Sequence, residues 1–197
     1  MSKPLTGQVA VVTGAAGALG RAVEERLVEL GATVAQLDVI EISNGHYCDV
    51  CDLTDTAATA AAVEKNNAEL GNIQIVAKIA GGFAMGEAVH ETTAETWDFL
   101  MGLNASSVLN IARAVVPQMI SQGNGMIVNI GAGAGQRGEA LMGSYAASKS
   151  VVIRLTESMS EELKEAGINV NCVLPSIIDT ERNRYDMPDA DFSRWVT

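Results

Sequence analysis

Aromatic residues are scarce in this chain of 197 residues: Phe, Trp and Tyr make up 4% of it, although 48% of the residues are hydrophobic. Aliphatic side chains must therefore fill the interior, and this length suffices for one substantial core in a single domain, residues 1–197. Cysteine is scarce as well. Cys48, Cys51 and Cys172 cannot all pair with one another, which argues against a disulfide framework and predicts a reducing, cytoplasmic setting.

Positive charge and long apolar runs are also in short supply. The chain has 13 Lys and Arg against 24 Asp and Glu, a formal net charge of −11. Such a field repels phosphate backbones and anionic membrane surfaces, so we expect no nucleic-acid partner and no membrane partner. Uninterrupted apolar runs stay below the ~18 residues of a membrane span, and the first residues lack the apolar stretch and cleavage site of a secretory signal.

One pattern in the sequence suggests a metal. Cys48 and Cys51 form a C-x-x-C pair that follows His46 in the stretch HYCDVCD. A closed zinc site needs four ligands, however, and the sequence contains no second Cys/His pair. We therefore expect no metal and interpret the cysteines as small buried hydrophobic residues. A zinc protein stays open as a minor alternative that metal analysis would decide.

Three junctions along the chain share one pattern, in which a stretch with helical periodicity ends at a glycine and a β-branched strand follows. The glycines are Gly31, Gly71 and Gly167, and glycine readily adopts the left-handed conformation that ends a helix. The repeated order is typical of right-handed parallel βαβ units. The sequence predicts a doubly wound parallel α/β domain, with strands near 8–13, 33–38, 46–48, 73–79, 125–130 and 168–174 and helices near 18–30, 55–70, 95–121 and 145–166.

The first predicted turn, in VAVVTGAAGALGRAVEERL, is rich in glycine. Gly14 lets the chain turn sharply off the strand, Gly17 permits close backbone approach to a ligand, and Gly20 lets the helix pack on the sheet. Free N–H groups and the positive dipole end at the helix start favour a pyrophosphate. A glycine turn alone is weak evidence, but its place at the start of a βαβ unit indicates a dinucleotide site.

Asp38 ends the second predicted strand, TVAQLD. A carboxylate at this strand end can accept both ribose hydroxyls of adenosine, and it repels the 2′-phosphate of NADP. The next residue is Val39 rather than Arg or Lys. We therefore predict NAD(H) as the preferred cofactor.

The stretch GSYAASKS places Tyr145 and Lys149 four positions apart, on one face of a helix that begins near Ser144. A nearby ammonium favours tyrosinate and is expected to lower the tyrosine pKa from ~10 toward the working range. Such a tyrosine can donate a proton to a carbonyl oxygen or accept one from an alcohol. Spacing alone does not distinguish this pair from a surface tyrosine beside a solvated lysine.

Several further motifs, which occur in a fixed order along the chain, favour the acid/base pair over the surface tyrosine. TGAAGALG, Asp38, CDV (48–50), IAGG (79–82), Asn104, SYAASK and PSIIDT (175–180) resemble the short-chain dehydrogenase/reductase family over essentially the whole chain. The resemblance implies a Rossmann-like NAD(P)-binding domain and hydride transfer between NAD(H) and a secondary alcohol or ketone. It also implies a homodimer or homotetramer formed through the fourth and fifth helices.

The resemblance assigns roles to individual residues as well. Tyr145 would be the acid/base, Lys149 would shift its pKa and hold the nicotinamide ribose, and Asn104 would bind a water that relays protons to Lys149. Contacts with NAD are implied for Gly14, Gly17, Leu19 and Gly20 at the pyrophosphate, Asp38, Ala80 and Gly81 at the adenosine ribose, Asp49 and Val50 at the adenine, Tyr145 and Lys149 at the nicotinamide ribose, and Pro175, Ile178 and Thr180 at the carboxamide.

The chain departs from the family pattern at several places. Ala18 stands where the middle glycine of Thr-Gly-x-x-x-Gly-x-Gly is usual, and Lys78 and Ile79 replace both asparagines of Asn-Asn-Ala-Gly. Lys78 sets a charge inside a strand, where burial is costly and no partner can be named. The resemblance also leads us to expect a further helix and a seventh strand after Thr197, so the chain is either truncated or has a six-stranded sheet.

The departure with the largest chemical consequence is Ala132, thirteen residues before Tyr145, where the family has a serine that polarises the substrate carbonyl. Losing one such donor costs ~10²–10³ in rate. Gln136 and Arg137 could replace it, whereas Ser144 is expected to point elsewhere.

Two classes of function follow: an NAD-dependent oxidoreductase, and a sensor or scaffold that binds NAD without efficient turnover. For the enzyme, residues 83–92, 133–142 and 180–197 would shape a partly apolar substrate pocket, with Phe83, Met85 and Met142 among its walls. The substrate itself cannot be derived from these residues.

Overall fold

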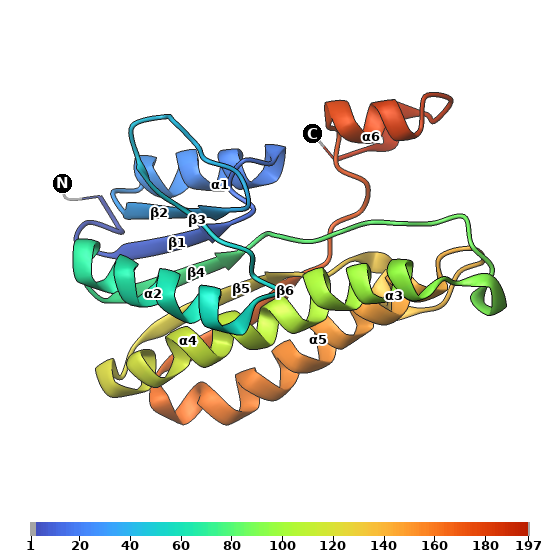
Figure 1. Cartoon of the computed structure of the whole chain (residues 1–197). Helices are drawn as coiled ribbons and strands as arrows, with labels where there is room; N and C mark the ends of the chain where they lie inside the picture. Colours follow the sequence, from blue (N-terminus) through green and yellow to red (C-terminus); the bar gives the residue numbers. More distant parts are fainter. Residues whose placement is uncertain (1–2, 197) are drawn as a thin grey trace.

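The fold is a six-stranded parallel sheet with helices on both faces. The computed structural model describes residues 3–196, and its strands lie side by side in the order β3-β2-β1-β4-β5-β6 (Figure 1). The predicted doubly wound α/β fold is confirmed. The strands are β1 (Val9–Thr13), β2 (Thr33–Asp38), β3 (Tyr47–Val50), β4 (Ile73–Lys78), β5 (Gly125–Ile130) and β6 (Ile168–Val173).

Two hydrophobic clusters cover the two faces of the sheet. On one face, α1 (Ala18–Glu29) packs over Ala10, Val12 and Val34. On the other face, α2 (Thr56–Leu70), α4 (Ser107–Gln122) and α5 (Gly143–Leu163) lie side by side and enclose the larger cluster, which includes Val11, Leu37 and Val76 (Figure 1). Because β1 contributes alternate residues to both clusters, its run of apolar residues is explained.

The long helix expected over 95–121 is interrupted. It consists of α3 (Ala94–Leu100), a π-helical segment over Met101–Ser106 and α4. The π-helical segment contains Asn104, and such segments occur frequently at functional sites. By length and apolar composition alone the stretch Ala94–Gln122 could cross a membrane, but 44% of its most apolar window is buried inside the protein, as in a core helix.

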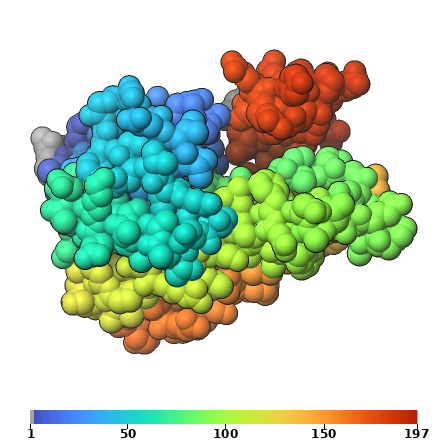
Figure 2. All heavy atoms as spheres, in the orientation of Figure 1, coloured from blue at the N-terminus to red at the C-terminus, as the bar shows by residue number. Residues whose placement is uncertain are grey.

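The chain that follows β6 forms a separate lobe at the carboxyl ends of the strands. It contains α6 (Glu181–Asp186), which the sequence did not predict, and a parallel bridge between Ile178 and Val196. Figure 2 shows this segment in red, across a narrow gap from the blue N-terminal half. Short 3₁₀-helices occur at Val89–Glu91, Gly133–Gln136, Lys164–Ala166 and Phe192–Arg194.

Candidate active site

A cavity of about 890 Å³ lies at the carboxyl ends of the central strands, where the chain order reverses between β1 and β4. Parallel α/β sheets bind their ligands at this switch point. Eight of the residues predicted to contact NAD line the cavity: Gly14, Gly17, Leu19, Gly20, Asp38, Ala80, Gly81 and Thr180. The lobe after β6 forms the opposite wall through Asp179–Asn183.

The glycine turn is packed so closely that side chains are excluded from it. Gly14 has φ +64°, and a Cβ placed on it would lie 2.8 Å from the backbone nitrogen of Ala80. A Cβ on Gly20 would lie 2.1 Å from the carbonyl oxygen of Gly14. The N-cap of α1 is Gly17, and no side chain among residues 3–196 caps its first turn, which leaves backbone N–H groups and the positive dipole end for an anion.

Asp38 is fixed in the cavity wall by backbone groups. Its Oδ2 accepts a hydrogen bond from the backbone N–H of Ala16 at 2.9 Å, and its Oδ1 accepts one from Val39 at 2.8 Å. These bonds tie the end of β2 to the glycine turn. The carboxylate therefore lies beside the proposed pyrophosphate site, where an adenosine ribose would follow.

Asp49 and Val50, the two residues predicted to contact the adenine, do not line the large cavity. The Asp49 carboxylate is buried and accepts hydrogen bonds from Lys65 and Asn66 of α2, while Val50 is 61% exposed and does not line the cavity. Cys51 and Leu53 form this wall instead. The Asp49 side chain is turned toward α2, and the contact of residues 49–50 with adenine stays a prediction.

Pro175 and Ile178 likewise contribute to the lobe rather than to the cavity wall. The carbonyl oxygen of Pro175 accepts a hydrogen bond from Gly133, and that of Ile178 accepts one from Asn183 at 2.8 Å. In the predicted segment 175–180, only Asp179 and Thr180 line the cavity.

Tyr145 and Lys149 lie near one another on the first two turns of α5. The Tyr145 ring meets Phe83 edge to face, with ring centroids 4.9 Å apart, and the Lys149 Nζ lies 5.9 Å from the Tyr145 ring centroid. Lys149 Nζ donates to the carbonyl oxygen of Ile130 at 2.9 Å. It would also lie 3.3 Å from a Cβ placed on Gly81, so the amine sits directly behind that part of the cavity wall.

The titration of this pair differs from the sequence-based expectation. Burial raises the pKa of Tyr145 above its usual value, and burial lowers the pKa of Lys149 to about 8. The structure does not show the expected lowering of the Tyr145 pKa by Lys149. Desolvation of the phenol is the dominant effect, and the Lys149 amine bonds to the carbonyl oxygen of Ile130 instead. Tyr145 is consequently a protonated phenol at neutral pH, the form that donates a proton.

Asn104 clamps the loop after β4 to the helix that carries Tyr145. Its Oδ1 accepts from the backbone N–H of Gly82 at 2.9 Å, and its Nδ2 donates to the Gly82 carbonyl at 3.0 Å and to Ser148 Oγ at 2.9 Å. The side-chain amide is thus engaged by protein groups. The water relay remains a prediction, and the structure assigns Asn104 a positioning contact.

The candidate donors near Ala132 in the sequence are engaged elsewhere or exposed. Arg137 points to solvent and pairs with Glu139 at 3.3 Å, and Gln136 is exposed. Ser144 Oγ donates to Thr92 Oγ1 at 3.3 Å, so it points away from Tyr145, as expected. None of these three side chains is directed toward the Tyr145 ring in the described part of the chain.

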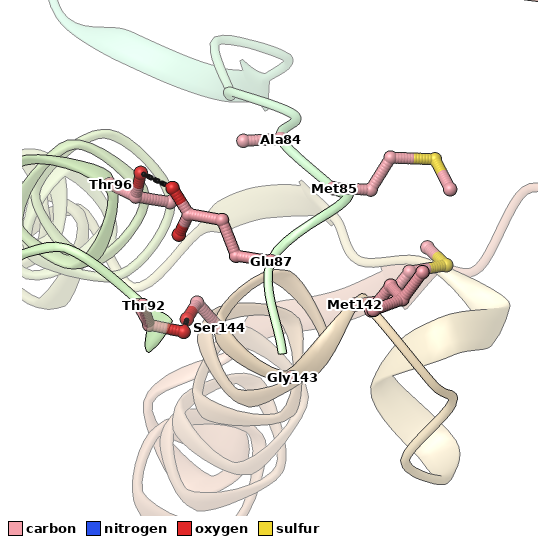
Figure 3. A pocket seen from close by; sticks show the side chains of 9 residues that line it. Ala84, Met85, Glu87, Thr92, Thr96, Met142, Gly143 and Ser144 are labelled. Carbon is pink, nitrogen blue, oxygen red and sulfur yellow. Dashed lines mark hydrogen bonds between the residues drawn. The ribbon is translucent and has the colours of Figure 1, made fainter. Parts of the chain in front are cut away.

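A second, smaller cavity of about 40 Å³ adjoins the start of α5 (Figure 3). Thr96 donates to the Glu87 carboxylate at 3.0 Å, and Ser144 lies beside Thr92. Met85 and Met142 line another side. Met85, Glu87, Thr92 and Met142 belong to the segments predicted to shape the substrate pocket, whereas Thr96 lies on α3 and Ser144 on α5; together they combine apolar walls with hydroxyl and carboxylate groups.

The residues of the potential zinc motif have different surroundings. His46 Nε2 lies 3.8 Å from Glu24 Oε1, and Cys51 lines the large cavity. Over residues 3–196 there is no group of three or more His, Cys, Asp or Glu side chains that could hold a metal ion.

The site contains a polar residue whose partners the sequence could not reveal. Lys78 is 3% exposed at the end of β4, and its Nζ donates to the carbonyl oxygens of Ala80 at 2.6 Å and Leu103 at 3.1 Å. The partners are backbone carbonyls, which no side-chain pattern in the sequence predicts.

Fold and site together define a dinucleotide-binding α/β oxidoreductase, in which a glycine turn, a carboxylate at the end of β2 and a Tyr/Lys helix meet at one sheet edge. The family model for short chain dehydrogenases matches residues 8–191, and the chain belongs to this family.

Among similar proteins is sorbitol dehydrogenase of Cereibacter sphaeroides, 37% identical over 199 residues, which cover 96% of this chain and 77% of the relative. Galactitol 2-dehydrogenase of Agrobacterium fabrum is 32% identical over 201 residues, 97% of this chain and 77% of that protein. The structure also resembles carveol dehydrogenase from Mycobacterium avium in complex with NAD, with a TM-score of 0.86 and 25% identity over 96% of this chain and 79% of that chain.

Proposed function

We propose that this protein interconverts a secondary alcohol and its ketone with NAD(H) as cofactor and Tyr145 as the acid/base. The observation that carries the proposal is the placement of Lys149 directly behind Gly81, a residue of the large cavity, with Tyr145 one helical turn away. This arrangement places a proton donor near the part of the large cavity that Gly81 lines.

The residues of the cavity fit NAD. The glycine cradle and the uncapped start of α1 suit the pyrophosphate, Asp38 suits the ribose hydroxyls, and the volume lies within the range of small-molecule sites. When bound, the nicotinamide supplies or accepts the hydride. Arg21 also lines the cavity and would offset one of the two negative charges of the pyrophosphate, whereas Arg182 is paired with Asp186 at 2.7 Å.

The protein's own residues would manage the proton. In the reductive direction the Tyr145 phenol donates its proton to the substrate oxygen, and in the oxidative direction the phenolate takes the proton of the alcohol. For Lys149 to stabilise the phenolate that forms, its ammonium, which lies 5.9 Å from the ring centroid and bonds to Ile130, would have to turn toward the Tyr145 oxygen. Phe83 packs against the ring and holds its orientation.

For the substrate we propose a polyhydroxylated alcohol or the matching ketose. Two relatives are named for sorbitol and galactitol, and the smaller cavity offers Glu87, Thr92 and Ser144 for hydroxyl groups. The test is a panel of sugar alcohols, ketoses and simple cyclic alcohols, assayed at 340 nm with NAD(H) and NADP(H). Turnover of sugar alcohols above cyclic alcohols is expected, and the reverse order would contradict this substrate class.

Asp38 is expected to determine the choice between NADH and NADPH. Replacing Asp38 by Asn removes the charge that repels a 2′-phosphate, so the ratio of kcat/KM for NADH to that for NADPH should fall about tenfold or more. Glu41→Gln is the matched control, because it removes an exposed charge from the same loop outside the cavity. Equal efficiency of the wild type with both cofactors would show that Asp38 does not discriminate.

A sensor or scaffold that binds NAD without efficient turnover is the second candidate, and Ala132 is the observation that favours it. NADH binding followed by fluorescence, with no turnover of any compound of the panel, would support it. We further propose that the protein is cytoplasmic and that it forms a homodimer or homotetramer. Sedimentation of the purified protein would test the oligomeric state.

A further inference from the structure

Lys78 occupies an unusual place in the site. It is the last residue of β4 and lies in register with Thr13 of β1 and Asn129 of β5, so three polar side chains form a row across the central strands. Lysine is almost never fully buried unless it is paired. At 3% exposure, this lysine therefore requires a structural explanation.

The two acceptors of its amine lie on different walls of the large cavity. Ala80 belongs to the loop 79–82 that follows β4, and Leu103 belongs to the π-helical segment, one residue before Asn104. Both residues line the cavity. A single side chain therefore joins the loop to the segment that carries the Asn104 clamp.

Lys78 is buried without an anionic partner: among residues 3–196 it forms no ion pair, its two acceptors are neutral carbonyl oxygens, and an uncharged amine still has an N–H for each of them. The nearest positive charge is Lys149 on α5. Cys172 of β6, in register with Asn129, and Tyr145 of α5 are the other titratable groups on this face of the sheet. Burial and the charge of Lys149 lower the pKa of Lys78 to about 7.

We propose that Lys78 is a positioning residue of the oxidoreductase site, which acts as an uncharged amine and ties the cavity wall at Ala80 to the π-helical segment of Asn104. The inference rests on the proposed function, since the wall that it orders belongs to the proposed NAD site. It also accounts for the loss of the asparagines that its family has before Ala-Gly, because Lys78 supplies hydrogen-bond donors at this position.

Protonation of Lys78 is expected to disturb the site at low pH. The ammonium would add a third N–H donor and a second buried positive charge near Lys149, so kcat/KM should decline as the pH falls below about 7. The same titration affects folding. Because the folded-state pKa lies below that of an unfolded lysine, the unfolded chain binds more protons between about pH 7 and about pH 10.4, and stability rises with pH across this window.

Two substitutions separate positioning from charge. Lys78→Met keeps the apolar stem and removes both donors, and it should lower kcat/KM about 10²-fold at every pH and weaken NADH binding. Lys78→Asn keeps amide N–H donors that do not titrate. Its kcat/KM should stay within about tenfold of the wild-type value and should not decline below about pH 7. Lys164→Met, at an exposed lysine after α5, is the control that should change neither quantity.

A second readout does not depend on turnover. In protein labelled with ¹³C-lysine, the Cε signal that disappears in Lys78→Asn is expected to titrate near pH 7 in the wild type. A signal that remains that of an ammonium up to about pH 9 would overturn the proposal, as would wild-type kcat/KM and pH profile in Lys78→Met. Should Lys78→Met not fold, Lys78→Asn and the wild-type titration decide the question.

The two proposals can fail separately. If the wild type binds NADH but turns over no substrate, the proposed function fails, and the titration together with NADH affinities of the variants still tests Lys78. If the wild type turns over substrate while its Lys78 signal titrates like an exposed lysine, only the inference about Lys78 fails.

Discussion

Replacement of Tyr145 by Phe is expected to lower kcat about 10³-fold while NADH still binds. The phenol is the group placed to exchange a proton with the substrate oxygen, and positioned acid/base groups contribute ~10²–10⁴ in rate. Phenylalanine keeps the ring that packs edge to face on Phe83, so the local structure should persist. Steady-state assays with the best substrate of the panel, together with NADH fluorescence titration, measure both quantities.

The control for this substitution is Tyr185→Phe, which removes the hydroxyl of a tyrosine that is 82% exposed on α6. Its kcat should equal that of the wild type. If Tyr145→Phe retained more than about a tenth of wild-type kcat, Tyr145 would not be the acid/base and the proton would have to come from another group.

Replacement of Ala132 by Ser is expected to raise kcat by up to about 10²-fold. The substitution introduces a hydroxyl thirteen residues before Tyr145, where the family has its carbonyl-polarising serine, and one such donor contributes ~10²–10³. Ala132 is 8% exposed and in extended backbone immediately after Gly131, so the added oxygen should face the protein interior. The gain should appear in kcat more than in KM, because the bond strengthens as negative charge develops on the oxygen.

The control is Ala61→Ser, which adds the same atom at an exposed position of α2 outside both cavities, where kcat should not change. A wild-type kcat in a folded Ala132→Ser protein would mean that another donor already serves the substrate oxygen. A gain would show that this chain is an oxidoreductase that works without one of its family's usual groups.

The sequence was sufficient to predict most of the sheet, because a strand's apolar run and a helix-ending glycine are local features. Gly31, Gly71 and Gly167 mark three of the helix-to-strand connections, and all three have positive φ in the structure. The glycine turn and Asp38 could be assigned for the same reason: a strand, a turn and a helix that are adjacent in the chain form one half of the cavity.

Features that depend on tertiary contacts could not be predicted in this way. The π-helical segment at Asn104 has the composition of an ordinary helix, and its partners Gly82 and Ser148 lie 22 and 44 residues away. Lys78 could be recognised as costly but not as satisfied, because its partners are backbone carbonyls. The part that Cys51 and Leu53 take in the cavity wall could not be predicted either, because it depends on the direction of each side chain at the end of β3.

The most direct test of the account is to follow the hydride itself. The protein is incubated with NADH deuterated at C4 of the nicotinamide and a ketone substrate, and the alcohol product is analysed by mass spectrometry. The account predicts deuterium at the carbinol carbon with the wild type, from one of the two C4 positions, and its loss in Tyr145→Phe. Tight NADH binding with no deuterium in any product would contradict it and leave a protein that binds the dinucleotide without using it.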